Sequence, residues 1–226
     1  MTQPLRSSHR ESGHTWEREN NNRTLIRGDK ILDSTYGRLC FEKMSKIYFV
    51  RHGETVWNVE NKICGATDSP LTEKGHEQAV ETAKNILALN VSADLILYSP
   101  LSRAKDTAMH ISEILGVPAK EEPRLFEQNF GKYESTARDG KEFHEMKKGF
   151  VHRFGGGESM LQLAQRVYNL LDELKEQPGK TFILVAHNGI ARVVQSYFYE
   201  MTNDEFASFG IKNCEVREYE LTENEP

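Results

Sequence analysis

Three stretches of the chain are continuously apolar and rich in β-branched and aromatic residues, as is typical of strands buried on both faces of a sheet. They cover residues 46–50, 94–98 and 181–186. Elsewhere the apolar positions recur with helical spacing. The expected helices and last strand are, in that order, Glu73–Leu89, Ser159–Glu176, Ile190–Glu200 and Glu215–Leu221. Strands that alternate with helices predict an α/β fold, a three-layer sandwich whose mostly parallel central sheet has helices on both faces.

Two of the predicted strands end at a histidine. The first stops at Arg51-His52-Gly53, and the second stops at His187-Asn188-Gly189. The glycines allow a tight turn after each strand. In open parallel sheets, ligands bind at the edge where the strands end. Two imidazoles and an arginine at that edge indicate chemistry on an anion.

The remaining predicted strand leads into a helix whose first turn carries Arg103. We expect Ser99 to be the N-cap of this helix and Pro100 to be its first residue. Gly116 should end the helix after about Leu115. A guanidinium beside the exposed N–H groups of a helix start favours an oxyanion, because the charge and the helix dipole have the same sign there.

These motifs together resemble the histidine phosphatase superfamily, the phosphoglycerate mutase-like family, over roughly residues 46–221. The matching segments are Arg51-His52-Gly53-Glu54-Thr55, Trp57-Asn58, Gly65, Asp68-Ser69-Pro70-Leu71-Thr72, Gly75, Ser99-Pro100-Leu101-Ser102-Arg103-Ala104, Leu125-Phe126-Glu127, Gly131, Glu134, Gly157-Glu158-Ser159, His187 and Gly189. Arg-His-Gly alone would be weak evidence, whereas the full set in this order is specific.

The resemblance implies a role for each polar residue of the site. His52 would be the nucleophile, which requires an unprotonated ring nitrogen. Glu127 would be the general acid and then the base for water. A cationic His187 would be stabilised by the phosphate that it holds. The phosphate-binding residues implied are Arg51, Asn58, Arg103 and Asn188, and no metal or other cofactor is expected.

Within the family, the chain resembles the small phosphatase branch. Phosphoglycerate mutases carry long insertions that shield the phosphohistidine from water. Here only about 30 residues separate Glu127 from Gly157. We therefore expect a phosphomonoesterase for small phosphorylated metabolites, with mutase activity as the alternative.

Two other interpretations were weighed. His52, His187 and Glu127 have side chains that can bind a metal, but the adjacent arginines would repel a cation. A binding module without catalysis is known in the superfamily, typically after loss of the nucleophile or the acid. Both of those residues are present in this chain.

The segment after Glu127, at about residues 129–156, is expected to form a cap over the site. It mixes aromatic residues with cations at Lys132, Arg138, Lys141, Lys147, Lys148 and Arg153. If these cations face the pocket, they favour substrates with a second negative group. If instead they form a solvated helix face, they carry no such preference.

Composition excludes several classes of partner. The 226 residues suffice for one α/β domain. A net charge of −5 does not favour nucleic acid or acidic membranes. No segment approaches about 18 consecutive apolar residues, so no spanning helix is expected. Three scattered cysteines do not make a disulfide framework, and we expect a cytoplasmic protein with a small phosphate ester as its partner. Its oligomeric state is not encoded in these patterns.

The N-terminal stretch differs from the rest of the chain. Residues 1–43 are rich in Arg, Asn, Ser and Glu and lack both an apolar signal region and a hydrophobic period. Residues 44–47 resemble the usual start of the family domain, so the domain is expected at 44–226. We expect residues 1–43 to be an extended gene start or a disordered tail, with a docking segment as the alternative.

Overall fold

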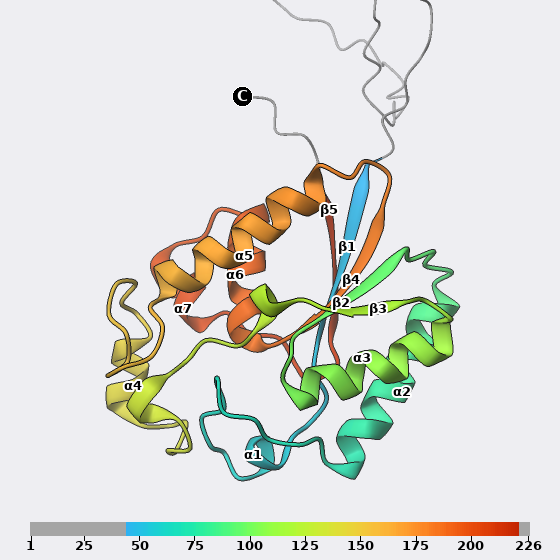
Figure 1. The fold of residues 1–226 in the computed structure, drawn as a ribbon. Helices are drawn as coiled ribbons and strands as arrows, with labels where there is room; N and C mark the ends of the chain where they lie inside the picture. Colours follow the sequence, from blue (N-terminus) through green and yellow to red (C-terminus); the bar gives the residue numbers. More distant parts are fainter. Residues whose placement is uncertain (1–43, 222–226) are drawn as a thin grey trace, which may run out of the picture. The chain divides into compact units, whose positions relative to one another are not determined.

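A computed structural model gives the structure of residues 44–221. The expectation for residues 1–43 lies outside the described residues. The described chain is built on a five-stranded sheet with the order β3-β2-β4-β1-β5 (Figure 1). The strands are β1 (Ser45–Arg51), β2 (Leu95–Tyr98), β3 (Ala119–Glu121), β4 (Thr181–Ala186) and β5 (Val216–Leu221).

The sheet is mostly parallel, as predicted. β1, β4, β2 and β3 run in one direction, and β5 pairs antiparallel with β1 at the edge. Arg51 pairs with Ala186 where β1 and β4 end, and Tyr98 of β2 pairs with Val185. Three strands therefore end at the same edge. β3 was not expected, because its sequence Ala-Lys-Glu has no apolar run and is held only as a short edge strand against β2.

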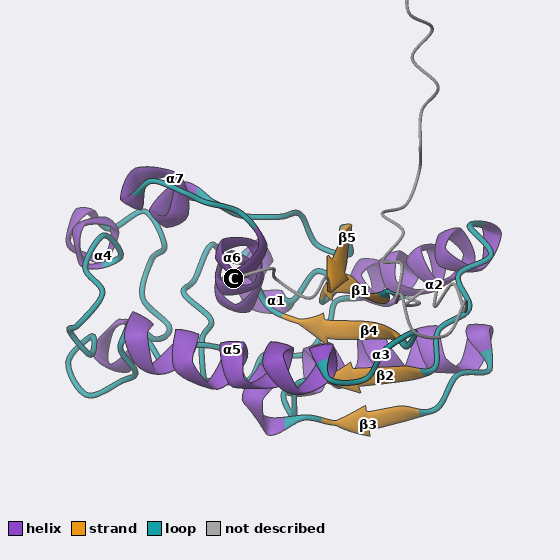
Figure 2. Cartoon of the chain, turned by 90° about the horizontal axis from the view of Figure 1, so that it is seen from above, coloured by secondary structure: helices purple, strands orange, loops and turns teal. Residues whose placement is uncertain are grey.

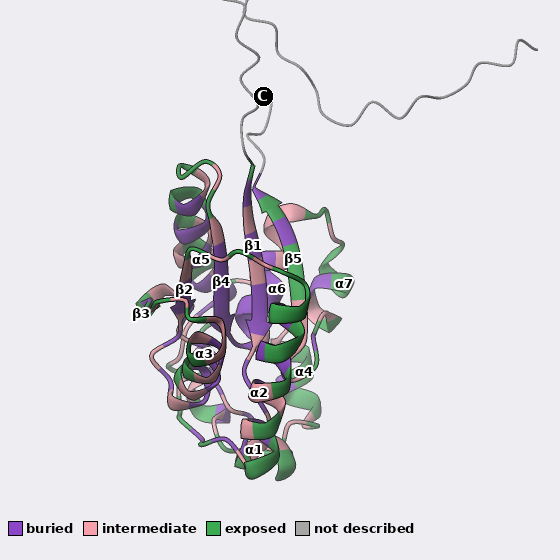
Figure 3. Ribbon diagram, turned by 90° about the vertical axis from the view of Figure 1, so that its right-hand side faces the viewer, coloured by how far each residue is buried: buried purple, intermediate pink, exposed green. Residues whose placement is uncertain are grey.

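Helices cover both faces of the sheet. The long ones are α2 (Glu73–Ala88), α3 (Ser102–Leu115), α5 (Met160–Lys175) and α6 (Asn188–Phe198). Neighbouring strand residues separate into two cores: Phe49 packs with α5 and α6, whereas Val50 packs with α2 and α3. β1 and β4 are largely buried between these layers, whereas the edge strand β5 and the outer helix faces are more exposed (Figure 3). The predicted three-layer sandwich is thus confirmed.

The helix boundaries lie within two residues of the predicted ones, and Pro100 is not the first residue of α3. The structure starts α3 at Ser102 with Leu101 as an N-cap that makes no side-chain bond, so the prediction that Ser99 caps this helix is wrong. Ser99 instead continues the sheet, donating its N–H to the Val185 carbonyl at 3.1 Å. Gly116 ends α3 in the left-handed region, with a φ of 66°, as predicted. No helix within residues 44–221 is both long and apolar enough to cross a membrane.

Residues 129–156, the cap segment, have a small core of their own. They contain η2 (Gly131–Tyr133) and α4 (Lys141–Met146). Four aromatic residues of the segment form this core together with one isoleucine from a neighbouring loop: Phe130, Tyr133, Phe143, Phe154 and Ile63. The short helices outside the segment are α1 (Val56–Val59), η1 (Pro123–Leu125) and α7 (Asn203–Ser208). α4 and α7 lie beside each other at one end of the molecule, away from the strands (Figure 2).

The turn after β1 is packed directly against the first turn of α2. A Cβ atom added to Gly53 would overlap the Gly75 carbonyl, and one added to Gly75 would overlap the Glu54 carbonyl. Backbone therefore meets backbone, with no flexible side chain that could move aside. This contact fixes the turn that follows His52.

We expect Gly75→Ala to lower the free energy of unfolding by about 1–3 kcal/mol, the usual cost of overpacking. At an open helical position the same change would stabilise the protein by up to about 1 kcal/mol. The sign of the change in the free energy of unfolding therefore shows whether Gly75 is tightly packed. The measurement is urea denaturation. Gly140→Ala is the matched control, because a Cβ there meets only the Ala137 carbonyl oxygen, at 3.6 Å. A Gly75→Ala protein as stable as the wild type would contradict the packing described.

Candidate active site

The two histidines come together at the carboxyl edge of the sheet. His52 follows β1 and His187 follows β4, and the residues before them, Arg51 and Ala186, are partners in register. Their ring centroids lie 5.2 Å apart, with the planes tilted by 57°. His52 is 5% exposed and His187 is fully buried. The parallel register thus delivers both imidazoles to one small volume.

One hydrogen bond determines which nitrogen of His52 can react. Its Nδ1 lies 2.7 Å from the Gly53 carbonyl oxygen. Because a carbonyl only accepts, Nδ1 carries the proton and Nε2 keeps a free lone pair. Burial, followed by the charges of Arg103 and Arg51, holds the pKa of His52 well below its ordinary value of 6.5. His52 is therefore a neutral base with its nucleophilic nitrogen on Nε2.

Asn213 holds the backbone around His52. Its Nδ2 lies 2.9 Å from the His52 carbonyl oxygen, 3.0 Å from that of Gly53 and 3.1 Å from the Asn58 Oδ1. The Gly53 N–H donates to the Thr107 hydroxyl at 3.1 Å. The Asn58 amide oxygen is therefore engaged, which leaves the Asn58 Nδ2 as the donor available to a phosphate.

His187 carries its proton on the opposite nitrogen. The Arg103 Nε–H donates to His187 Nδ1 at 3.2 Å, so Nδ1 is unprotonated. His187 Nε2 lies 2.7 Å from the Ser99 hydroxyl oxygen and donates to it. Burial, followed by the charges of Arg103 and His52, lowers the pKa of His187 well below 6.5. His187 is neutral in this arrangement, and its cationic form remains a prediction for the phosphate-bound site.

Arg103 is fixed from several sides in the first turn of α3, where the sequence places it. It is 1% exposed. Its Nη2 donates to the Gly65 carbonyl at 2.7 Å, and its Nη1 donates to the Thr67 carbonyl at 3.0 Å. The loop that supplies these carbonyls is held in turn by Glu134, whose carboxylate accepts the N–H groups of Gly65, Ala66 and Thr67 at 2.9–3.2 Å. The guanidinium position is thus set before any substrate binds.

Arg51 and Asn188 meet at one loop residue, Ile211. Arg51 Nη1 donates to the Ile211 carbonyl at 2.6 Å, while the Ile211 N–H donates to Asn188 Oδ1 at 2.9 Å. The Arg51 Nε is buried and bonds to no group within residues 44–221. Burial and the charge of Arg138 lower the pKa of Arg51 to about 10, which leaves it cationic at neutral pH. The Asn188 side chain contacts this loop through Ile211, and its role in binding phosphate stays a prediction.

Glu127 is buried beside the start of α6. Its two carboxylate oxygens accept the backbone N–H groups of Gln128 at 2.9 Å and Gly189 at 3.0 Å. A Cβ on residue 189 would collide with this carboxylate, which explains the glycine two residues after His187. Electrostatic attraction links Glu127 to Arg51. The carboxyl group predicted as acid and base therefore lies beside the cationic centre.

Comparison with known proteins places the chain in a family. The model of the histidine phosphatase superfamily (branch 1) matches residues 47–226. The chain belongs to this superfamily. The predicted enzyme class, a phosphoric monoester hydrolase of the histidine phosphatase type, is confirmed by this membership.

Three relatives illustrate the range of the superfamily around this chain. "Probable phosphoglycerate mutase GpmB" of Escherichia fergusonii is 38% identical over 156 residues, which are 66% of this chain and 71% of that protein. The mycobacterial glucosyl-3-phosphoglycerate phosphatase in complex with VO3 has a TM-score of 0.68 at 25% identity, covering 76% of this chain and 90% of the other. The α-ribazole phosphatase of Shigella flexneri has a TM-score of 0.65 at 26% identity, covering 76% and 89%.

Sequence patterns alone missed two residues of this histidine phosphatase site. Ser99 was interpreted as a helix cap but bonds to His187, and Asn213 lies in a loop with no motif of its own. The position of Ser99 at the end of a predicted strand was a signal for the site. Nothing local marked Asn213, because it reaches His52 from 161 residues away.

The alternative of a metal centre has no matching arrangement of side chains. In the part of the chain that the structure describes, no three His, Cys, Asp or Glu residues are placed to hold a metal ion. His52, His187 and Glu127 lie instead among arginines. Their shared environment suits an anion.

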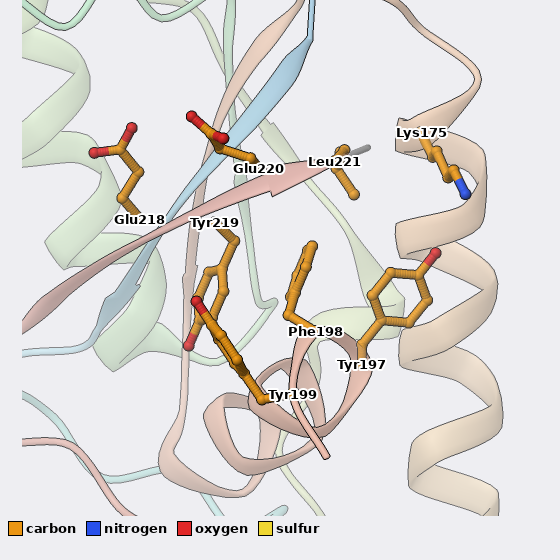
Figure 4. A pocket seen from close by; sticks show the side chains of 8 residues that line it. All are labelled: Lys175, Tyr197, Phe198, Tyr199, Glu218, Tyr219, Glu220 and Leu221. Carbon is orange, nitrogen blue, oxygen red and sulfur yellow. The ribbon is translucent and has the colours of Figure 1, made fainter. Parts of the chain in front are cut away.

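A cavity of about 570 Å³ lies away from this site (Figure 4). It is lined by the end of α6 and by β5, with the side chains of Tyr197, Tyr199 and Tyr219 around it. Phe198 ends α6, whereas His187 caps its start, so about 16 Å of helix separates the two. This cavity contains none of the predicted site residues.

We expect both site imidazoles of the ligand-free protein to be mainly neutral at pH 6.5, because burial and the arginines oppose their protonation. As the pH falls below 6.5, the unfolded chain takes up protons that the folded site refuses, so the free energy of unfolding should decrease. Nitrogen-15 NMR of histidine-labelled protein measures the ring titrations, with His52→Asn and His187→Asn providing the assignments. A ring that is half protonated at pH 6.5 or above would contradict this electrostatic account.

Proposed function

We propose that this protein is a metal-independent phosphomonoesterase that hydrolyses small phosphorylated metabolites through a phosphohistidine at His52. The observation that supports this most is the hydrogen bond from His52 Nδ1 to the Gly53 carbonyl, at 2.7 Å. It leaves Nε2 unprotonated in a pocket lined by arginines. Such a nitrogen is a nucleophile suited to a dianionic phosphoryl group.

In the first step, His52 Nε2 forms a bond to phosphorus while the bond to the ester oxygen breaks. The leaving oxygen takes a proton from the Glu127 carboxylic acid, so an alcohol departs and Glu127 becomes a carboxylate. Arg51 and Arg103 neutralise the charge on the phosphoryl oxygens, which is the main requirement of phosphoryl transfer. Contact with the phosphate would raise the pKa of His187 and so favour its uptake of a proton from solvent.

In the second step, water attacks the phosphohistidine. The Glu127 carboxylate takes one proton from this water as the new oxygen–phosphorus bond forms, and the bond between phosphorus and His52 Nε2 breaks. Inorganic phosphate then leaves, and both Glu127 and His52 return to their starting states. Each proton that Glu127 gives in the first step is thus recovered in the second.

The same charges support the proposed metal independence. Arg103 lies against His187, and Arg51 acts electrostatically on His52. These guanidiniums supply the charge neutralisation that a divalent cation gives in other phosphatases. A metal ion placed between them would be repelled.

Phosphoglycerate mutase activity is the second candidate, because a relative 38% identical to this chain carries that name. The chain between Glu127 and Gly157 is only about 30 residues long, which favours access of water to the phosphohistidine. A non-catalytic phosphate-binding module is the third, but the nucleophile, the acid and the cations are all in place. Hydrolysis is the activity that these features support best.

We expect phosphate release from small phosphomonoesters to continue in EDTA and to fall by at least about 10³-fold in His52→Ala, because no other group replaces the nucleophile. The measurement is inorganic phosphate release from p-nitrophenyl phosphate, sugar phosphates, α-ribazole phosphate and 3-phosphoglycerate. His110→Ala is the control, since it removes an imidazole that bonds His76 on the outer helices.

Three results would contradict the proposal. Loss of turnover in EDTA with recovery on adding a divalent metal would exclude metal independence. Equal turnover in wild type and His52→Ala would exclude the nucleophile. Isomerisation of 3-phosphoglycerate without phosphate release would establish the mutase.

A further inference from the structure

A second buried cation lies next to the proposed catalytic centre but has no role in the steps above. Arg192, on α6, is 2% exposed. Its Nε and Nη1 atoms are buried and bond to no group within residues 44–221. Its guanidinium lies over the ring of Phe206 on α7, at 5.7 Å. Burying donors without partners is costly, so a residue of this kind needs an explanation.

The helix directs Arg192 towards Glu127. Residues three apart lie on the same helix face, and the N–H of Gly189, three residues before Arg192, donates to the Glu127 carboxylate. Glu127 attracts Arg192 electrostatically. No ion pair joins the two in the described part of the chain, and the two carboxylate oxygens accept backbone N–H groups. The charge of Arg192 is therefore not neutralised by direct contact.

Lys147 and Arg138 of the cap segment add to this charge. Burial and the nearby Arg192 and Arg138 lower the pKa of Lys147 to about 8. Lys147 makes no ion pair within residues 44–221, and its Nζ lies 6.0 Å from the ring centroid of Phe143. Arg138 makes one side-chain hydrogen bond, to the Lys62 carbonyl at 3.0 Å. The charges of Arg192 and Arg138 both act on Lys147.

Two other cap lysines behave differently. Lys132 pairs with Glu142 at 3.1 Å and Lys148 pairs with Glu145 at 3.0 Å, and all four side chains are exposed. They form the solvated face that was one of the two possibilities for the cap. The cap segment therefore contains exposed, paired lysines as well as Lys147 and Arg138, which make no ion pair within residues 44–221.

The position of Glu127 assigns these cations to the leaving group. Glu127 interacts with Arg51 at the phosphoryl site and also with Arg192 and Lys147. In the proposed reaction its proton goes to the leaving oxygen. In that reaction Arg51 holds the transferred group, so Arg192 and Lys147 remain for the part of the substrate that departs.

We propose that Arg192, Lys147 and Arg138 form a second anion subsite, which binds a carboxylate or a phosphate on the leaving group of the substrate. This inference rests on the proposed phosphatase function. The phosphoryl group that is transferred binds Arg51 and Arg103, and a second anion neutralises the charge of Arg192, Lys147 and Arg138. Substrates would thus be phosphomonoesters whose alcohol part is itself acidic.

A competing place for the leaving group has a different character. A cavity of about 290 Å³ is lined by Glu127 itself and by Phe126, Gln162 and Arg166. Arg166 is already paired with both carboxylate oxygens of Glu158 at 2.8 Å. This cavity offers no unpaired charge from Arg166 and suits a neutral leaving group. The two sites therefore predict opposite substrate preferences.

The test compares two esters that differ in one group. 3-Phosphoglycerate carries a carboxylate where glycerol 3-phosphate carries a hydroxymethyl group, and fructose 1,6-bisphosphate against fructose 6-phosphate tests a second phosphate. We expect the wild type to favour the more acidic member of at least one pair, in kcat/KM, by about tenfold to hundredfold. Which pair shows the preference distinguishes a carboxylate from a phosphate.

Three variants assign the preference to the subsite. Arg192→Met, close in length and apolar, should reduce the ratio of the two kcat/KM values towards one, whereas Arg192→Lys should keep part of it. Lys147→Met changes a partly exposed residue of the cap segment. It should also reduce the ratio, and it replaces Arg192→Met as the test if that variant does not fold. Lys84→Met, at an exposed position of α2, removes the same charge elsewhere and should leave the ratio unchanged.

Two outcomes separate this subsite from the proposed function. Suppose that the wild type hydrolyses esters with a neutral leaving group through His52. If the ratio of the two kcat/KM values is near one, or is unchanged in both Arg192→Met and Lys147→Met, the second subsite is wrong and the proposed phosphatase function stands. If no ester of either pair, nor p-nitrophenyl phosphate, releases phosphate, the proposed function itself is wrong.

Discussion

The hydrogen bond between the His52 ring and the Gly53 carbonyl decides which ring nitrogen carries a lone pair, and much of the surrounding structure holds that carbonyl in place. Asn213 donates to the same oxygen from the loop before β5. The Gly53 N–H is bonded to Thr107 of α3, and the glycine lies against Gly75 of α2. Helices on one face of the sheet and a loop at its edge strand therefore converge on a single peptide unit. The orientation of the nucleophile is a property of the whole fold.

Charge is the second constraint. Arg51, Arg103, Arg138, Lys147 and Arg192 lie around two imidazoles and one carboxylate, and Lys147 and Arg192 make no ion pair in the described chain. Such an arrangement costs stability, since buried charges need compensation. The same environment keeps His52 neutral and nucleophilic, because burial and then the charges of Arg103 and Arg51 lower its pKa. A substrate that brings negative charge relieves the repulsion, which couples binding to the protonation that the chemistry requires.

The parts of the fold that depend on local pattern were predictable. The continuous apolar runs gave β1, β2 and β4, and parallel pairing then required His52 and His187 to share an edge. The start of α3 was mispredicted, because Ser99 is a good cap by residue type and its hydroxyl is taken by His187, 88 residues away. Asn213 and Arg192 had no local signal for the same reason: their roles depend on contacts between distant segments. Motifs thus identify residues that do chemistry, whereas those that position them or neutralise charge emerge only from packing.

The most direct test is to find where the phosphoryl group is attached. The wild-type protein would be mixed with a phosphomonoester it hydrolyses, quenched in base within one turnover, and digested for mass spectrometry, with phosphorus-31 NMR on the labelled peptide. We predict one phosphoryl group, on Nε2 of His52, because Nδ1 is held by the Gly53 carbonyl. Attachment to Nδ1 of His52, or to any residue other than His52, would contradict the geometry on which the proposed mechanism depends.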